Sequence, residues 1–110
     1  MKSNFSVNKE FLLKTAKEIL EFNSPTGFCF EIMDKIEAII KPFGYNFERN
    51  NKGCGIITVE GKNNEKTIGM CAHVDTLGAM VRSITPSGNL KFTILGGPIL
   101  PTLDSEYCTI

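Results

Sequence analysis

The chain has 110 residues, of which 42% are hydrophobic and 22% charged, proportions typical of a soluble globular protein and too apolar for a disordered one. This length allows one small domain with a modest core. Twelve basic residues balance twelve acidic ones, so there is no charge excess of the kind that binds nucleic acid or an anionic membrane surface.

A helix is predicted first. It starts after Asn8, a residue type that caps helix N-termini, and its apolar residues follow helical spacing as far as Leu20. The sequence Asn-Ser-Pro at residues 23–25 ends it, because proline does not continue a helix.

A second helix is predicted from Phe28 to Pro42, since apolar residues again trace one face. On its outer face, opposite charges four residues apart predict two ion pairs within the helix, Glu31 with Lys35 and Glu37 with Lys41.

The hydrophobic period then changes to that of strands. Residues 45–48 alternate, residues 50–53 form a turn, and residues 56–59 are rich in β-branched side chains. Residues 67–72 form a run almost without polar side chains, which predicts a strand covered on both faces.

The remaining residues predict a different β-structure. An amphipathic hairpin is expected from residues 80–84 and 90–94 around a turn at 86–89, and residues 107–110 resemble the beginning of another strand. Because a chain rarely ends inside such a run, we expect a piece of a longer protein. The order of elements predicts an α/β unit joined to a separate β-module.

Cysteines and apolar segments bear on the compartment. The four cysteines are too widely spaced for a Cys-x-x-Cys motif, and reduced thiols packed as small hydrophobes are expected. The first residues have no apolar segment typical of a signal peptide, and no run approaches the roughly 18 apolar residues of a membrane span. We therefore predict a cytoplasmic protein with no membrane partner.

His73 and Asp75 carry the chemistry that the sequence suggests. Side chains two residues apart on a strand point the same way, and these two follow the most apolar strand. One imidazole nitrogen can bind a metal while the other donates to the carboxylate. A solitary histidine with a purely structural role is the alternative. A nucleophilic role for Cys71 has less support, because no base is evidently paired with it.

Three features of the sequence resemble a known family. They are Ser-Pro-Thr-Gly at residues 24–27, residues 72–81, which include the His-x-Asp motif, and Gly96-Gly97 after the hairpin. The chain is similar to the N-terminal part of the tetrahedral di-metal aminopeptidases, metallopeptidase family forty-two. This family includes glutamyl and deblocking aminopeptidases and some proteins named endoglucanases.

The resemblance implies a fold and a site. Residues 1–78 would be the N-terminal segment of a three-layer zinc-exopeptidase-like catalytic domain, and residues 79–110 the beginning of an inserted β-rich dimerisation domain. His73 would be a ligand of one of two zinc or cobalt ions, and Asp75 would orient it. The metals would activate a water that hydrolyses the N-terminal bond of a peptide substrate.

The sequence also limits what this chain does alone. It contains one histidine, whereas the family uses a second histidine and further carboxylates, so we expect the chain to be inactive in isolation. The resemblance, through the inserted dimerisation domain, also implies that the parent forms a homo-oligomer. The alternatives are a non-catalytic remnant or interaction module of the same fold, and a related di-zinc exopeptidase or deacylase. We also expect exposed apolar surface, with poor solubility or self-association.

Overall fold

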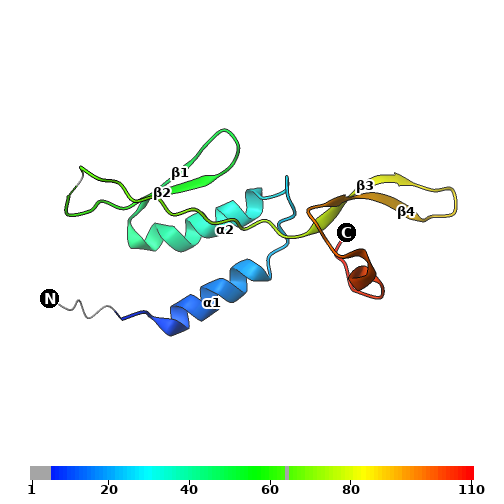
Figure 1. Ribbon diagram of the computed structural model, residues 1–110, viewed down its shortest axis with the longest axis horizontal. Helices are drawn as coiled ribbons and strands as arrows, with labels where there is room; N and C mark the ends of the chain where they lie inside the picture. The colour runs from blue at the N-terminus through cyan, green and yellow to red at the C-terminus, as the bar shows by residue number, and fades with distance from the viewer. Residues whose placement is uncertain (1–5, 64) are drawn as a thin grey trace.

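The computed structural model of the chain describes residues 6–63 and 65–110. These residues form two helices, two antiparallel hairpins and two short 3-10 helices (Figure 1). In chain order the elements are α1 (Lys9–Leu20), α2 (Phe30–Ile40), η1 (Lys41–Phe43), β1 (Asn46–Arg49), β2 (Gly55–Thr58), β3 (Gly78–Ile84), β4 (Leu90–Leu95) and η2 (Leu100–Leu103). The predicted α/β character is confirmed.

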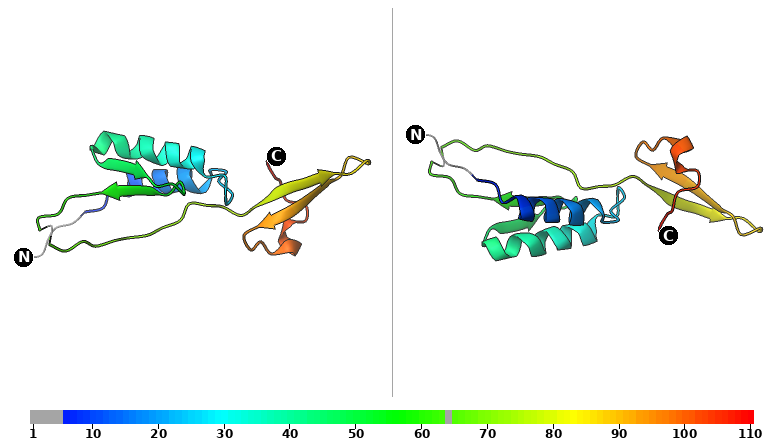
Figure 2. Two further views of the ribbon diagram at one scale, coloured as in Figure 1. Left: turned by 90° about the horizontal axis from the view of Figure 1, so that it is seen from above. Right: turned by 90° about the horizontal axis from the view of Figure 1, so that it is seen from below.

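The molecule is elongated. Its principal extents are 67 × 31 × 23 Å and its Cα radius of gyration is 19.0 Å, whereas a compact domain of this size has a radius of about 13 Å. The β3–β4 hairpin extends away from the helices in every view (Figures 1 and 2). The inserted β-domain and the boundary at residue 78 stay predictions.

The two helices lie where the sequence predicts them. Asn8 caps α1, because its Oδ1 accepts a hydrogen bond from the backbone N–H of Phe11 at 3.0 Å. The second helix begins at Phe30, two residues after the predicted start, because Phe28 still belongs to a turn in which its N–H donates to the carbonyl of Pro25 at 2.8 Å.

The ion pairs predicted within α2 are wrong. Lys35 instead contacts Glu18 of α1, with 3.1 Å between Nζ and Oε2. Glu37 contacts Arg49 of β1, with 2.7 Å between Oε2 and Nη2. Neighbouring elements bring opposite charges closer than the helix's own next turn does, so these pairs join α2 to α1 and to β1.

The β1–β2 hairpin forms as predicted. Its register pairs Phe47 with Ile57 and Arg49 with Gly55. The Oδ1 atom of Asn50 accepts backbone N–H groups within the turn, and Gly53 has a φ of 81° that favours glycine.

The β3–β4 hairpin is also confirmed. Its register shifts between Val81 and Ser83, which leaves one extra residue in β3. Such a bulge increases the local twist of a strand pair. Nearly all of this hairpin is exposed or half-exposed.

The core is very small. In the described part of the chain, Ile32 of α2 is the buried hydrophobic residue and Ser24 the buried polar one, both with no exposed surface. The ring of Phe43 packs edge-on against Phe11, with 5.6 Å between centroids, and stacks on Tyr45. Many large apolar side chains remain exposed.

The strand predicted at residues 67–72 is absent. This segment is extended but has no strand assignment, and Ile68 and Met70 are 91% and 94% exposed. Figure 2 shows it as a bare trace that leads towards β3. A strand needs a hydrogen-bonded neighbour, and no described strand pairs with this segment. The strand expected at residues 107–110 is missing for the same reason, and Tyr107 is fully exposed.

All four cysteines are free thiols, as predicted. The prediction that they pack as small hydrophobes is wrong for Cys54, Cys71 and Cys108, which are exposed. Cys29 is half-buried. Among the described residues, no helix is long and apolar enough to cross a lipid bilayer.

Candidate metal-binding corner

Two segments far apart in sequence meet beside His73 and Asp75. The N–H of Thr76 donates to the carbonyl of Ser24 at 2.9 Å, and the N–H of Ser24 donates to Oγ1 of Thr76 at 3.3 Å. An isolated parallel bridge joins Pro25 to Thr76. These contacts fix the backbone on the C-terminal side of Asp75.

Ser24 also holds the chain on the N-terminal side of Asp75. Its hydroxyl donates to the carbonyl of Val74 at 2.6 Å, and the side chain is fully buried. A buried hydroxyl needs a partner, so this bond both satisfies Ser24 and fixes the peptide that precedes Asp75.

The loop and the site segment continue in contact as far as β3. A β-carbon added to Gly78 would lie 2.6 Å from the β-carbon of Pro25, closer than any side chain tolerates. Glycine at this position therefore allows the loop to lie against the start of β3.

His73 and Asp75 face one another, with 2.9 Å between Nδ1 of the ring and Oδ1 of the carboxylate. The second oxygen, Oδ2, accepts a hydrogen bond from the hydroxyl of Thr26 at 2.7 Å. These hydrogen bonds, first that of Thr26 and then that of His73, hold the pKa of Asp75 below its ordinary value. Asp75 is therefore an anion at neutral pH.

This arrangement offers one ligand position for a metal. With Nδ1 directed at Asp75, the other ring nitrogen, Nε2, remains for a metal, and the side chain of His73 is 86% exposed. In the described residues, no three His, Cys, Asp or Glu side chains cluster in a way that could hold an ion. The donors present fit one corner of a site.

The sequence pointed to His73 and Asp75, which the structure brings together, but it missed Thr26. Residues 24–27 were noted only as a family motif, and nothing in the spacing placed a threonine hydroxyl on Asp75.

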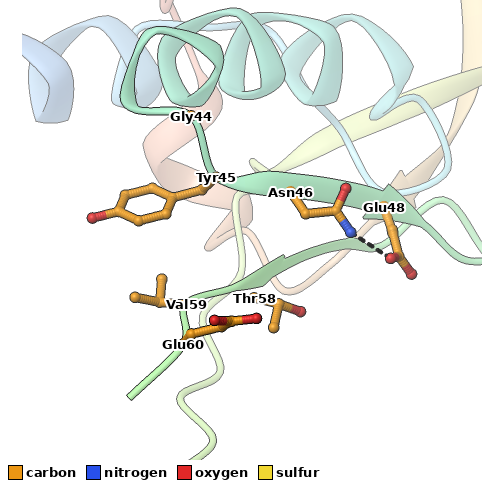
Figure 3. Close-up of a pocket in the computed structure, with 7 residues that line it drawn as sticks. All are labelled: Gly44, Tyr45, Asn46, Glu48, Thr58, Val59 and Glu60. Carbon is orange, nitrogen blue, oxygen red and sulfur yellow. Dashed lines mark hydrogen bonds between the residues drawn. The ribbon is translucent and has the colours of Figure 1, made fainter. Parts of the chain in front are cut away.

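A shallow hollow at the open end of the β1–β2 hairpin is separate from this corner (Figure 3). Within it, the side-chain amide of Asn46 donates to Oε1 of Glu48 at 2.6 Å. Its lining includes neither His73 nor Asp75 and consists of Gly44, Tyr45, Asn46, Glu48, Thr58, Val59 and Glu60.

Comparison with known families identifies the chain. A model of the M42 glutamyl aminopeptidase family matches residues 53–110, more than half of the chain, and the match includes His73 and Asp75. The chain belongs to this family. The predicted resemblance to metallopeptidase family forty-two is thus confirmed, and it places the chain among aminopeptidases at the level of the family.

Two relatives agree with the assignment. The Bacillus subtilis (strain 168) protein named "Putative aminopeptidase YhfE" is 38% identical over 98 residues, which cover 89% of this chain and 28% of that protein. The protein named "Glutamyl aminopeptidase" of Lactococcus lactis subsp. cremoris (strain MG1363) is 31% identical over 87 residues, covering 78% of this chain and 24% of that protein. The chain therefore spans about a quarter of the length of these two relatives.

Proposed function

We propose that this chain is part of a metal-dependent aminopeptidase, in which His73 binds one of two divalent metal ions through Nε2 and Asp75 orients it. The 2.9 Å contact between Nδ1 of His73 and Oδ1 of Asp75 is the observation that carries the proposal. A carboxylate behind a histidine fixes the tautomer and makes the ligand more basic.

Each residue has a stated task in this proposal. His73 would bind the metal through its unprotonated Nε2, and Asp75 would accept a hydrogen bond from the protonated Nδ1 of the same ring. Zinc or cobalt, when bound, would polarise the carbonyl of a peptide substrate and activate a water. The general base and the remaining metal ligands would come from other parts of the parent protein.

Other properties of the parent follow as proposals. Four free thiols suit a reducing compartment such as the cytoplasm. The exposed apolar residues on both hairpins suit a parent that assembles as a homo-oligomer.

The decisive experiment uses a parent protein that contains this chain. His73→Ala should remove about one metal per subunit, measured by elemental analysis, and should abolish cleavage of amino-acid chromogenic amides. Lys62→Ala, on an exposed loop, is the matched control and should keep both properties. Full metal content and activity in His73→Ala would refute the proposed role.

The 110-residue chain gives a complementary test. Incubated with zinc or cobalt and the same amides, it should show no turnover, because one histidine does not complete a two-metal site. Measurable turnover that is abolished by His73→Ala would show that the site of the isolated chain is complete, contrary to this expectation.

A non-catalytic interaction module is the second candidate, favoured by the lack of a three-ligand cluster in the described residues and by the exposed apolar side chains. It predicts that His73→Ala leaves both metal affinity and partner binding unchanged.

A further inference from the structure

We propose that Thr26 is a positioning residue, which sets the orientation of the Asp75 carboxylate and thereby the tautomer of His73. Its consequence for metal binding rests on the proposed function, but the positioning itself does not. The loop at residues 24–27 would then be an extension of the metal corner and not only a structural connection between the helices.

Each oxygen of the Asp75 carboxylate has its own hydrogen-bond partner. Oδ2 of Asp75 lies 2.7 Å from the Thr26 hydroxyl, and Oδ1 lies 2.9 Å from Nδ1 of His73. An ionised carboxylate only accepts hydrogen bonds, so the Thr26 hydroxyl must be the donor. With one oxygen held by Thr26, rotation about the last side-chain bond of Asp75 is restricted, and the other oxygen stays directed at His73.

A tight turn holds Thr26 in place. It is the second residue of a turn in which the N–H of Phe28 donates to the carbonyl of Pro25 at 2.8 Å. The third residue of this turn is Gly27, with a φ of 89°, a value that type II turns require and that glycine adopts without strain. The turn therefore fixes the backbone from which the Thr26 hydroxyl reaches Asp75.

The loop at residues 24–27 is attached to residues 74–76, the segment that contains Asp75. Ser24 binds the backbone at Val74 and Thr76, on either side of Asp75. Thr26 then binds the Asp75 side chain. Backbone and side chain of Asp75 are thus fixed by residues two positions apart in one loop.

The chemical consequence concerns the proton on His73. When Asp75 accepts from Nδ1–H, the ring is held in the tautomer whose Nε2 carries a lone pair for a metal. A carboxylate free to rotate would lose this hydrogen bond part of the time, and the ring would also adopt the tautomer with the proton on Nε2.

The test measures the His73 tautomer by nitrogen NMR of the ring in the full chain, where it is the one histidine. Thr26→Val should lower the population protonated on Nδ1, and Thr26→Ser, which keeps the hydroxyl, should restore it. Protection of the Thr76 amide from hydrogen exchange checks that the loop still contacts the site. An unchanged tautomer ratio in Thr26→Val with a protected Thr76 amide overturns the proposal.

Thr26→Ala guards against a local rearrangement caused by the extra methyl group of valine. It removes the hydroxyl without adding bulk, and an unchanged tautomer ratio in this variant with a protected Thr76 amide also overturns the proposal.

Metal affinity separates this proposal from the proposed function. In a metal-loaded parent, Thr26→Val should weaken binding by about tenfold, the lower end of the effect of losing an outer-shell partner, and Thr26→Ser should not. A shifted tautomer with unchanged metal affinity would support the positioning role and count against metal ligation by His73.

Discussion

Pro25 and Gly78 lie so close together that the loop between the helices and the first residue of β3 leave no room for a side chain. The contact lies next to the Pro25–Thr76 bridge and therefore next to the candidate metal corner.

Gly78→Ala should separate the loop from the site segment. The added β-carbon would lie 2.6 Å from that of Pro25, and crowding of this kind typically costs about 1–3 kcal/mol. We expect a lower free energy of unfolding in chemical denaturation and faster hydrogen exchange at the Thr76 amide. Gly97→Ala is the matched control, because an added β-carbon there meets no atom within 4 Å. Equal behaviour of the two variants would contradict the close approach.

Removing Thr26 should alter the acid titration of Asp75 in the metal-free chain. The hydrogen bond from Thr26 is the largest single cause of its lowered pKa, and His73 lowers it further, so both Thr26→Val and His73→Ala should raise it. A carboxyl group whose pKa is lowered in the folded state stabilises the protein at pH values above its ordinary pKa. This contribution is lost as the pH falls through the pKa of the folded state. The stability of Thr26→Val should therefore depend less on pH in that range. Carbon NMR of the carboxylate measures both shifts, and an unchanged pKa of Asp75 in Thr26→Val would contradict this prediction.

Arg49 should join β1 to α2 in a salt-dependent way. Its Nη2 lies 2.6 Å from Oδ1 of Asp34 and 2.7 Å from Oε2 of Glu37, and these hydrogen bonds raise its pKa. Exposed ion pairs contribute modestly, so Arg49→Ala should lower the free energy of unfolding slightly at low salt. High salt should reduce the difference, because it screens the charges. A loss of stability that is the same at all salt concentrations would indicate packing of the Arg49 stem, not charge.

The isolated chain should self-associate. Ile68, Met70 and Tyr107 are almost completely exposed, and few apolar side chains are buried elsewhere in the described residues. Sedimentation should show a mass that rises with concentration, and Ile68→Lys combined with Met70→Lys should reduce it. A monodisperse monomer that melts sharply would contradict this prediction.

Local signals in the sequence were sufficient for the helices and hairpins. Asn8 fixes the start of α1 through a contact three residues away, and Asn50 organises its own turn. Such features depend on neighbours in the sequence, so pattern and residue type reveal them.

Features that depend on distant partners were predicted less well. Residues 67–72 have the composition of a buried strand, but composition does not supply the neighbour that a strand pairs with. The contact of Thr26 with Asp75 joins residues 49 apart, and no periodicity reports it. His73 and Asp75 were found because their chemistry is contained in three consecutive residues.

The joining of the loop to the site segment has a consequence for the order of folding. The hydrogen bonds from Ser24 and Thr26 to residues 74–76 span 49 to 52 positions, more than any other hydrogen bond of the described residues. Closing a longer loop costs more chain entropy, and contacts distant in sequence slow folding. The helices and hairpins should therefore form early, and the geometry of His73 and Asp75 should be acquired last.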